Sequence, residues 1–288
     1  PRINPFFIPK VIVDIASGWL SIKHGFMGPN FTTVSACATS TTAIIDAMNY
    51  IRWGKADIFV TGGSEAAINE AGIGGFNALK ALSTRNDDPS SASRPFDVDR
   101  DGFVMGEGGG ALILEEYEHA KRRGAKIYAE VAGGGMSADA YHLTATHPEG
   151  AGAILGMRWA LEDAGLTIDE VDYLNPHATS TPVGDESEMK AVAKLFASHL
   201  DKLHISATKS ATGHLLGGAG AIEAIISIKA VHEGIIPPTI NTQQIDPVMP
   251  AGLQIVTAES MRKDIRVAMS NTFGFGGHNA TAVFKKVD

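Results

Sequence analysis

The stretch Thr32-Thr33-Val34-Ser35-Ala36-Cys37-Ala38-Thr39-Ser40-Thr41-Thr42 contains the only cysteine of the 288-residue sequence. The preceding run, Phe31 to Val34, is β-branched and aromatic, which is typical of a buried strand. After the cysteine, apolar residues recur at helical spacing from Ala43 to Ile51. The pattern therefore predicts a strand, a tight turn that carries Cys37, and a helix.

A thiol at such a turn faces the free N–H groups and the positive dipole end of the helix. Both favour the thiolate, which is the nucleophilic form of cysteine. A lone cysteine is also often only a small buried hydrophobe. This stretch alone leaves both interpretations of Cys37 open.

Composition limits the class of protein. With 44% hydrophobic residues, 288 residues can build one large α/β unit or two domains. A net charge of −8 argues against a nucleic-acid partner. A single cysteine excludes an internal disulfide framework and fits a reducing, cytoplasmic compartment. The sequence has no apolar run long enough for a membrane span, no signal peptide and no initial Met, so we expect a fragment.

Strand and helix patterns alternate along the chain, which argues for α/β layers. Helices are expected at 11–24, 71–82 (short), 115–123, 150–164, 185–200 and 216–234. Strands are expected at 57–63, which ends in glycines, and at 111–114, 127–132, 171–175, 205–207, 254–257, 266–270 and 280–284. The polar segment 83–103 has to be a long loop, and its length favours a functional one over an ordinary surface loop. Gly133-Gly134-Gly135 is interpreted as a boundary.

A faint internal repeat supports two similar halves. Val34 to Ser40 resembles Ile205 to Ala211, and each stretch lies between strand residues and a helix that begins with small residues. Such halves would face each other across a pseudo-twofold axis.

Three further clusters carry polar chemistry. Asn175 to Pro182 places His177 at the end of a strand, where α/β folds collect function, although a structural histidine is the commoner case. Lys209 to Gly220 flanks a tight turn with Lys209 and His214, and its glycines fit helix packing better than a dinucleotide loop. Asn271 to Asn279 is glycine-rich, which permits positive φ and exposes backbone N–H groups to a ligand, or forms an ordinary hairpin.

Together, these motifs resemble the β-ketoacyl-acyl carrier protein synthases. The resemblance is carried, in matching order, by "SACATS", "ALSTRNDDPSSASRPFDVDRDGFVMGEGGGALILEE", "NPHATSTP", "TKSATGHLLGGAGAIE" and "NTFGFGGHNA". It runs from Pro5 to the C-terminus and is closest to the elongating type II synthases, with type I as the near alternative.

The sequence departs from the family pattern in a few places. Pro176 and Ala178 replace a frequent Ala and Gly, but neither side chain belongs to the chemistry. His278 replaces a frequent Thr. Roughly the first third of the family's chain is absent, so part of the N-terminal sheet and one edge of the substrate tunnel are expected to be missing.

The resemblance implies a thiolase-like fold of α-β-α-β-α layers with two similar halves. Residues 1–125 would be the remainder of the first half and would carry the nucleophile. Residues 126–288 would be the second half, with both histidines and the lysine. The implied reaction is fatty acid elongation: Cys37 takes an acyl group from acyl carrier protein, malonyl-carrier protein loses CO₂, and its carbanion attacks the acyl-Cys37 thioester.

The resemblance also implies a role for each site residue. His177 and His214, both neutral, would stabilise the oxyanion of decarboxylation, and Lys209 would support them, paired with Glu223. Backbone N–H groups of Cys37 and Phe275 would form a second oxyanion hole. The remaining implied roles are a gate at Phe275 with Phe273, pantetheine contacts from Thr179 and Thr181, acyl-tunnel walls at Phe76, Phe7 and Ile8, and a carrier-protein mouth at Lys80, Arg85 and Thr144.

No metal and no resident cofactor are expected, because phosphopantetheine arrives on the carrier protein. A homodimer is expected from the family. A degradative thiolase needs a second cysteine, and a catalytically dead partner subunit would lack Cys37. A non-catalytic acyl-binding module does not explain two histidines and a lysine. A polyketide ketosynthase has the same Cys-His-His set and remains open, as does the acyl chain length.

Overall fold

The computed structural model describes residues 3–287, so Pro1, Arg2 and Asp288 lie outside the described residues. Within that range no helix is both long and apolar enough to cross a bilayer. The helices are α1 (Phe7–Val11), α2 (Ile15–His24), α3 (Thr39–Arg52), α4 (Glu70–Ala78), α5 (Tyr117–Arg122), α6 (Ala151–Ala164), α7 (Pro182–Leu195), α8 (Lys209–Thr212) and α9 (Ala219–Glu233). Short 3₁₀ turns are η1 (Ala36–Ala38), η2 (Pro89–Ser91), η3 (Ile168–Glu170) and η4 (Leu216–Gly218).

The strands form two main sheets and one small pair. They are β1 (Ile58–Glu65), β2 (Gly108–Glu115), β3 (Glu130–Ala138), β4 (Tyr173–Asn175), β5 (His204–Ile205), β6 (Ile235–Ile236), β7 (Gln254–Ile255), β8 (Met261–Arg262), β9 (Val267–Gly274) and β10 (His278–Lys285). β1 pairs with β2 antiparallel, and the six-stranded sheet has the order β3-β10-β9-β4-β5-β7. The pairs among β9, β4, β5 and β7 are parallel, and β3, β10 and β9 pair antiparallel.

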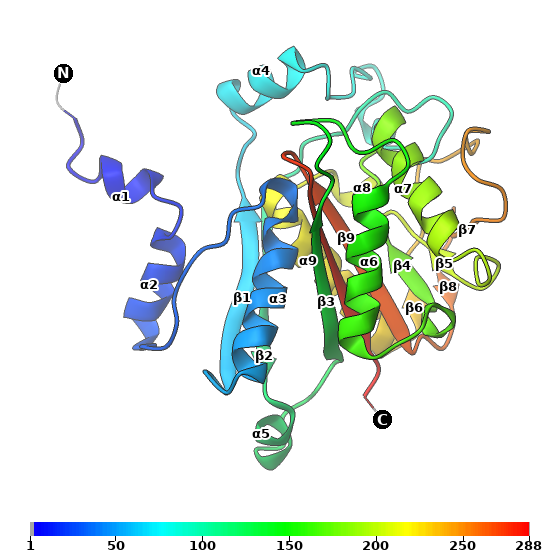
Figure 1. Cartoon of the computed structure of the whole chain (residues 1–288). Coiled ribbons are helices and arrows are strands. Elements are labelled where there is room, and N and C mark those ends of the chain that lie inside the picture. Colours follow the sequence, from blue (N-terminus) through cyan, green and yellow to red (C-terminus); the bar gives the residue numbers. More distant parts are fainter. Residues whose placement is uncertain (1–2, 288) are drawn as a thin grey trace.

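Helices and sheets alternate in layers (Figure 1). α3 and α9 lie between the β1–β2 sheet and the six-stranded sheet, where Ile44, Leu114 and Phe284 belong to one buried cluster. α6 and α7 cover the other face of the larger sheet, and a second cluster there includes Met157 and Phe196. α1 and α2 stand beside β1 on the outer side. The predicted α/β layering is confirmed.

The glycines at 133–135 are not a boundary, because they lie inside β3. They are needed for close packing: a Cβ at Gly135 would come within 2.1 Å of the Gly156 carbonyl oxygen on α6. A Cβ at Gly134 would come within 2.5 Å of Ile45 on α3. The strand is therefore compressed between two helix layers, and side chains at these positions would push the layers apart.

The segment Phe31 to Val34 is neither a strand nor buried. Within the described chain it joins no sheet, and Val34 is 75% exposed. β1 pairs only with β2, and the 31–34 segment does not add to that sheet. The Phe31 ring instead packs on Tyr50 and Phe59, at centroid distances of 5.3 and 6.3 Å.

Other elements differ from the predictions mainly at their ends. The helix expected at 11–24 is two helices, and it ends as predicted with Gly25 in a left-handed cap. The glycines before 111 belong to β2, and α7 begins at Pro182 and not at Asp185. α8 and the two-residue strands β6 and β8 were not predicted. The loop 83–103 is confirmed, but it is partly buried and not an ordinary surface loop.

The internal repeat is real, but its sequence match was wrong. The counterpart of the Cys37 turn is the turn at 216–218, because each is a 3₁₀ turn that leads into a long helix, α3 or α9. Ala36 and Leu216, the first residues of the two turns, have left-handed φ values of 50° and 47°. The stretch 205–211 forms β5 and α8 instead, so similar small residues misled the comparison.

Candidate active site

A cavity of about 370 Å³ lies where the two halves meet. It is lined from the first half by the Cys37 turn and α4, and from the second by the 177–184 segment, His214 and the β9–β10 turn. Ten of the predicted site residues line it: Cys37, Phe76, Lys80, Thr144, His177, Thr179, Thr181, His214, Phe273 and Phe275.

Five predicted residues do not line this cavity: Lys209 and Glu223, which lie behind its wall, and Phe7, Ile8 and Arg85. Phe7 and Ile8 lie on α1, where they are 51% and 58% exposed, and α1 has no buried residue. Their assignment to the acyl tunnel is wrong for this chain, because α1 stands off the body of the protein (Figure 1). Arg85 donates from its guanidinium to the Asp99 carbonyl oxygen at 3.1 Å, which ties it to its own loop.

Cys37 lies in η1, directly before α3, as predicted. The turn is held by Thr39, whose hydroxyl accepts from the Ser35 N–H at 2.9 Å and donates to the Ala36 carbonyl oxygen at 2.7 Å. Gly274, at the end of β9, packs directly against it, because a Cβ there would lie 2.6 Å from the Ser35 carbonyl oxygen. The end of β9 therefore packs against the turn that carries the nucleophile and supports it.

The resting state of Cys37 differs from the prediction. Burial raises the pKa of the Cys37 thiol to about 11, although the Lys209 ammonium and the Phe275 N–H both act to lower it. Desolvation therefore outweighs the helix end that favours the thiolate. The thiol is protonated at neutral pH, so attack on a substrate requires a nearby proton acceptor.

His177 and His214 meet edge to face in the cavity wall, with ring centroids 5.1 Å apart and planes at 88°. Burial holds the pKa of each well below its usual range, with the Lys209 ammonium as a further cause. Both rings are therefore neutral, and each can donate one N–H. Among residues 3–287 the Nδ1 of each ring is buried and meets no hydrogen-bond partner. Packing orients the rings: His214 lies against Phe103 and His177 against Phe273, at 5.3 and 5.6 Å.

Lys209 and Glu223 form a fully buried ion pair behind the cavity wall, with side chains 1% and 2% exposed. Burial raises the pKa of Glu223 to about 7 against the pull of the Lys209 ammonium. Its second oxygen, Oε2, has no hydrogen-bond partner in the described part of the chain. The predicted pairing is present in the structure, and it places a positive charge behind Cys37 and both histidines.

Glu188 on α7 is a site residue that the sequence analysis missed. Its carboxylate accepts from the N–H groups of His177 and Ala178 at 2.9 and 2.8 Å, and from Asn271 Nδ2 at 3.1 Å. Burial raises its pKa. The carboxylate therefore fixes the backbone that presents His177. The available signal was its spacing, because Glu188 shares a helix face with the apolar Ala191 and Val192.

The 83–103 loop supports the next part of the same segment. Ser180 N–H donates to Asp185 Oδ1 at 3.1 Å, and Ser180 Oγ accepts from the Arg94 N–H at 3.0 Å. Arg100 donates to the Pro182 carbonyl oxygen at 2.9 Å and lies 3.6 Å from Asp185. Burial raises the pKa of Asp185 to about 7. Thr179 and Thr181, whose hydroxyls are 3.1 Å apart, are thus held at a fixed position in the cavity wall.

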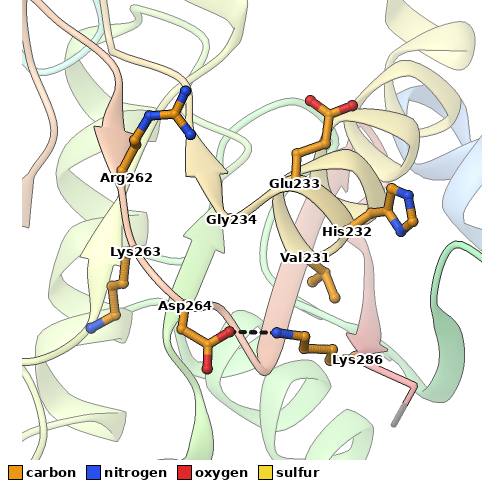
Figure 2. Close-up of a pocket in the computed structure, with 8 residues that line it drawn as sticks. All are labelled: Val231, His232, Glu233, Gly234, Arg262, Lys263, Asp264 and Lys286. Atoms are coloured by element: carbon orange, nitrogen blue, oxygen red, sulfur yellow. Dashed lines mark hydrogen bonds and ion pairs between the residues drawn. The ribbon is translucent and has the colours of Figure 1, made fainter.

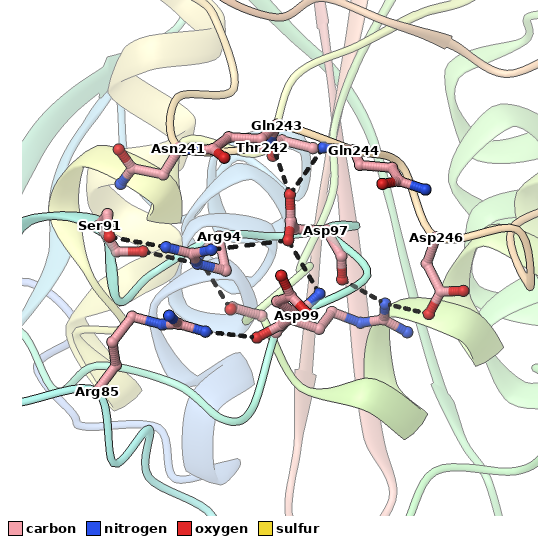
Figure 3. Close-up of polar contacts among 12 residues, drawn as sticks. Arg85, Ser91, Arg94, Asp97, Asp99, Asn241, Thr242, Gln243, Gln244 and Asp246 are labelled. Carbon is pink, nitrogen blue, oxygen red and sulfur yellow. Dashed lines mark hydrogen bonds and ion pairs between the residues drawn. The ribbon is translucent and has the colours of Figure 1, made fainter. Parts of the chain in front are cut away.

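The loop itself is fixed by charged contacts to residues 241–246 (Figure 3). Asp97 Oδ2 accepts from the N–H groups of Gln243 and Gln244 at 2.7 and 3.0 Å. Arg100 forms an ion pair with Asp246 at 2.7 Å. The loop is therefore a rigid part of the site and not a mobile excursion.

A second hollow, of about 440 Å³, opens at the end of α9 and is wide and shallow (Figure 2). Its charged residues are largely paired: Lys286 with Asp264 at 2.6 Å, and Glu233 with Lys229. Cys37 does not line it. Across residues 3–287 no group of three or more His, Cys, Asp or Glu side chains is arranged to hold a metal ion. The Cys37 cavity is therefore the candidate active site.

The chain matches known proteins over nearly its whole length. Residues 1–120 match the beta-ketoacyl synthase N-terminal domain, and residues 128–243 match the corresponding C-terminal domain. A mitochondrial 3-oxoacyl-[acyl-carrier-protein] synthase of Arabidopsis thaliana is 52% identical over 99% of this chain and 62% of its own length. The 3-oxoacyl-[acyl-carrier-protein] synthase 2 of Synechocystis is 50% identical over 99% of this chain and 68% of its own. The chain thus spans less than two thirds of the first of these relatives.

Solved structures of ketosynthases match the fold of this chain. A type II polyketide ketosynthase solved with its acyl carrier protein has a TM-score of 0.96 at 35% identity, over 99% of this chain and 70% of its own. A beta-ketoacyl synthase from Burkholderia phymatum has a TM-score of 0.94 at 38% identity, over 99% of this chain and 68% of its own. The predicted thiolase-like layering is therefore confirmed, and the chain belongs to the beta-ketoacyl synthase family.

Proposed function

We propose that the protein is an elongating 3-oxoacyl-acyl carrier protein synthase of fatty acid synthesis. The observation that carries the proposal is a single cavity in which Cys37 shares the wall with two buried, neutral histidines. Relatives named for this activity, at about 50% identity, support it. The reaction needs no cofactor bound by this chain, since phosphopantetheine arrives on the carrier protein.

In the first half-reaction, the Cys37 sulfur attacks the thioester carbonyl of acyl-carrier protein. The new S–C bond forms, the bond to the pantetheine sulfur breaks, and the thiol proton is transferred to that departing sulfur. A neutral histidine in the wall is suited to carry this proton, because its unprotonated ring nitrogen can accept the proton and return it. The backbone N–H groups of Cys37 and Phe275 stabilise the oxyanion.

In the second half-reaction, malonyl-carrier protein loses CO₂ and leaves negative charge on its thioester oxygen. His177 and His214 donate their ring N–H groups to that oxygen. The carbanion then attacks the acyl-Cys37 carbonyl, and the Cys37 sulfur leaves and regains a proton. Lys209, paired with Glu223, acts from behind the cavity wall as electrostatic support and does not line the cavity.

Phe275 is assigned the role of a gate, with Phe273 as the fixed residue behind it. Phe275 is 36% exposed and lies 6.3 Å from the Phe76 ring, whereas Phe273 is 7% exposed. Gly276 and Gly277, the next two residues, have φ values of 88° and 77°. A turn of this kind allows the aromatic ring to swing between a closed and an open position. Thr179 and Thr181 are assigned to the pantetheine arm.

The remaining assignments concern partners and organisation. Lys80 and Thr144, at the cavity rim, are proposed to meet an acidic carrier protein, as the polyketide relative was solved with its own carrier protein. Residues 1–125 and 126–288 are proposed as two half-units, supported by the separate family matches. A cytoplasmic homodimer is proposed, and light scattering of the purified protein measures its mass.

Mass spectrometry after incubation with acyl-carrier protein tests the function directly. We expect the acyl mass on the peptide that contains Cys37, and its release as β-ketoacyl-carrier protein after malonyl-carrier protein is added. Cys37→Ala is the control and should gain no acyl mass. Acylation at another residue, or condensation by folded Cys37→Ala, would contradict the proposal.

A polyketide ketosynthase is the second candidate, because that relative gives the TM-score of 0.96. The two functions diverge after the first condensation. A fatty acid synthase accepts saturated chains after reduction, whereas a polyketide enzyme extends unreduced β-keto chains repeatedly. Product analysis without reducing enzymes distinguishes them: one added two-carbon unit supports the first function.

A further inference from the structure

Glu65, at the end of β1, has no role in the reaction described above, yet its carboxylate lies at the junction of the two halves. Its Oε2 accepts from the Gly217 N–H at 3.2 Å. On the other side of the same residue, Ser40 Oγ donates to the Gly217 carbonyl oxygen. The Gly217 backbone is therefore held by one side chain at each end, and both side chains come from the half that carries Cys37.

Gly217 is the internal-repeat counterpart of Cys37. Each is the middle residue of a 3₁₀ turn whose first residue has left-handed φ, and each turn leads into a long central helix. A Cβ at Gly217 would lie 3.2 Å from Glu65 Oε2 and 3.7 Å from the Ala36 carbonyl oxygen. Gly217 thus lies near both the Glu65 carboxylate and the backbone that precedes the nucleophile.

Charges of both signs act on the thiol from different elements. The Lys209 ammonium on α8 lowers the pKa of Cys37, and the Glu65 carboxylate on β1 raises it. The neutral rings of His177 and His214 line the same cavity as Cys37. The other ionisable side chains that line the cavity are Lys80, Asp101 and Asp139.

We propose that Glu65 is a positioning residue that fastens the Gly217 turn to the end of β1 and places one negative charge near the nucleophile. The contact keeps the Gly217 turn, and Leu216 in the cavity wall, in place. The charge favours the protonated thiol in the resting enzyme, so Cys37 loses its proton only as the substrate is attacked. The role rests on the proposed function, but its two parts can be measured without it.

The charge is tested by the pH dependence of Cys37 alkylation with iodoacetamide. Glu65→Gln keeps an oxygen that can accept from Gly217 and removes the charge, so the profile should move to lower pH. Below its midpoint, we expect the rate to rise by a factor on the order of three. Glu65→Asp keeps the charge but withdraws it by one methylene, so its shift should be smaller and in the same direction. Glu107→Gln is the matched control, because Glu107 accepts from the Ile68 N–H at 2.8 Å and is not among the groups that act on Cys37.

The contact is tested by condensation kinetics and thermal unfolding. Glu65→Asp should lose the Gly217 contact, lower kcat more than it changes KM, and lower the melting temperature relative to Glu65→Gln. Circular dichroism checks that each variant folds, and either variant alone still reports on the charge. Unshifted alkylation profiles in both would overturn the role of the charge, and unchanged kcat in Glu65→Asp would overturn the role of the contact. Alkylation needs no carrier protein, so a failure of the proposed condensation would leave its result intact.

Discussion

The two main sheets differ in how completely they are covered. β9, at the centre of the six-stranded sheet, is buried at every position except its last, Gly274. β1, in the two-stranded sheet, has one buried residue, Thr61. His177 and His214 lie on the side of the cavity that is built on the six-stranded sheet, where buried carboxylates fix the segments around them. Cys37 lies on the side that is built on the two-stranded sheet, and a few contacts in turns hold its position. The nucleophile and the better-covered sheet therefore lie on different sides of the cavity, so substitutions on each side can separate effects on chemistry from effects on stability.

The largest contrast is between Cys37→Ala and Glu188→Ala. Cys37 touches the substrate but fills little core, so Cys37→Ala should abolish condensation and change the free energy of unfolding by less than about 1 kcal/mol. Glu188→Ala leaves three donors unpaired in a buried site and should cost about 3 kcal/mol or more. Urea unfolding and a condensation assay on both variants measure this. A strongly destabilised Cys37→Ala would contradict the separation.

A pair of apolar truncations compares the two sheets directly. Phe284 on β10 is fully buried, and Ile113 on β2 is 62% exposed. Phe284→Ala should cost about 3–5 kcal/mol, because it leaves a cavity between the sheets. Ile113→Ala should cost about 0.5 kcal/mol, as at other exposed sites. Equal losses in urea unfolding would show that β2 is covered in solution by a surface absent from this chain.

The histidines test the chemistry on the well-covered side. His177→Ala and His214→Ala should each slow malonyl decarboxylation by about 10²–10³, the usual cost of one oxyanion donor. Acyl transfer to Cys37 should be less affected. Release of radiolabelled CO₂ and the rate of acyl-Cys37 formation give the two values. Normal CO₂ release in both variants would remove the histidines from this role.

The smallest effect concerns pH. The pKa of Glu223 is raised to about 7 in the folded protein, above its unfolded value of about 4.3. The folded state therefore keeps this proton to higher pH, and the free energy of unfolding should fall as pH rises from about 4 to about 7. Glu223→Gln cannot titrate, so this fall should be flattened in its stability profile. Glu233→Gln, at the exposed end of α9, is the control, and a profile unchanged by Glu223→Gln would contradict the assignment.

Local patterns predicted the elements that local forces decide. The Cys37 turn, α6 and the β9–β10 turn follow from small residues, apolar spacing and glycine, and each was found. The prediction for Gly133 to Gly135 was wrong because glycine occurs both in turns and in strands that pack closely against a helix. The sequence alone does not distinguish these two roles. Phe31 to Val34 was misread because β-branched residues do not reveal whether a partner strand exists.

The site residues also fall into those that the sequence predicted and those that it did not. Cys37, His177, His214 and Lys209 were predicted through family motifs, and the structure brings them together around one cavity and its buried support. Glu188, Asp185 and Arg100 were missed because a carboxylate or guanidinium on a loop or helix is usually solvated. Many of their partners are backbone groups on other segments, from 5 positions away for Asp185 and Ser180 to 82 for Arg100 and Pro182, and a local pattern does not identify such partners. Phe7 and Ile8 failed as tunnel walls because their helix packs on no core in this chain.

The clasp between the 83–103 loop and residues 241–246 has a consequence for protein synthesis. Arg100 and Asp246 are 146 positions apart in the sequence, and Asp97 and Gln243 are equally far apart. At about 5–20 residues per second, the ribosome needs roughly 7–30 s to supply the second partner after the first. During that interval the guanidinium and carboxylate remain hydrated, and the wall that presents Thr179 and Thr181 is unsupported. A nascent chain that already carries Cys37 therefore has no complete cavity until residues 241–246 have been synthesised.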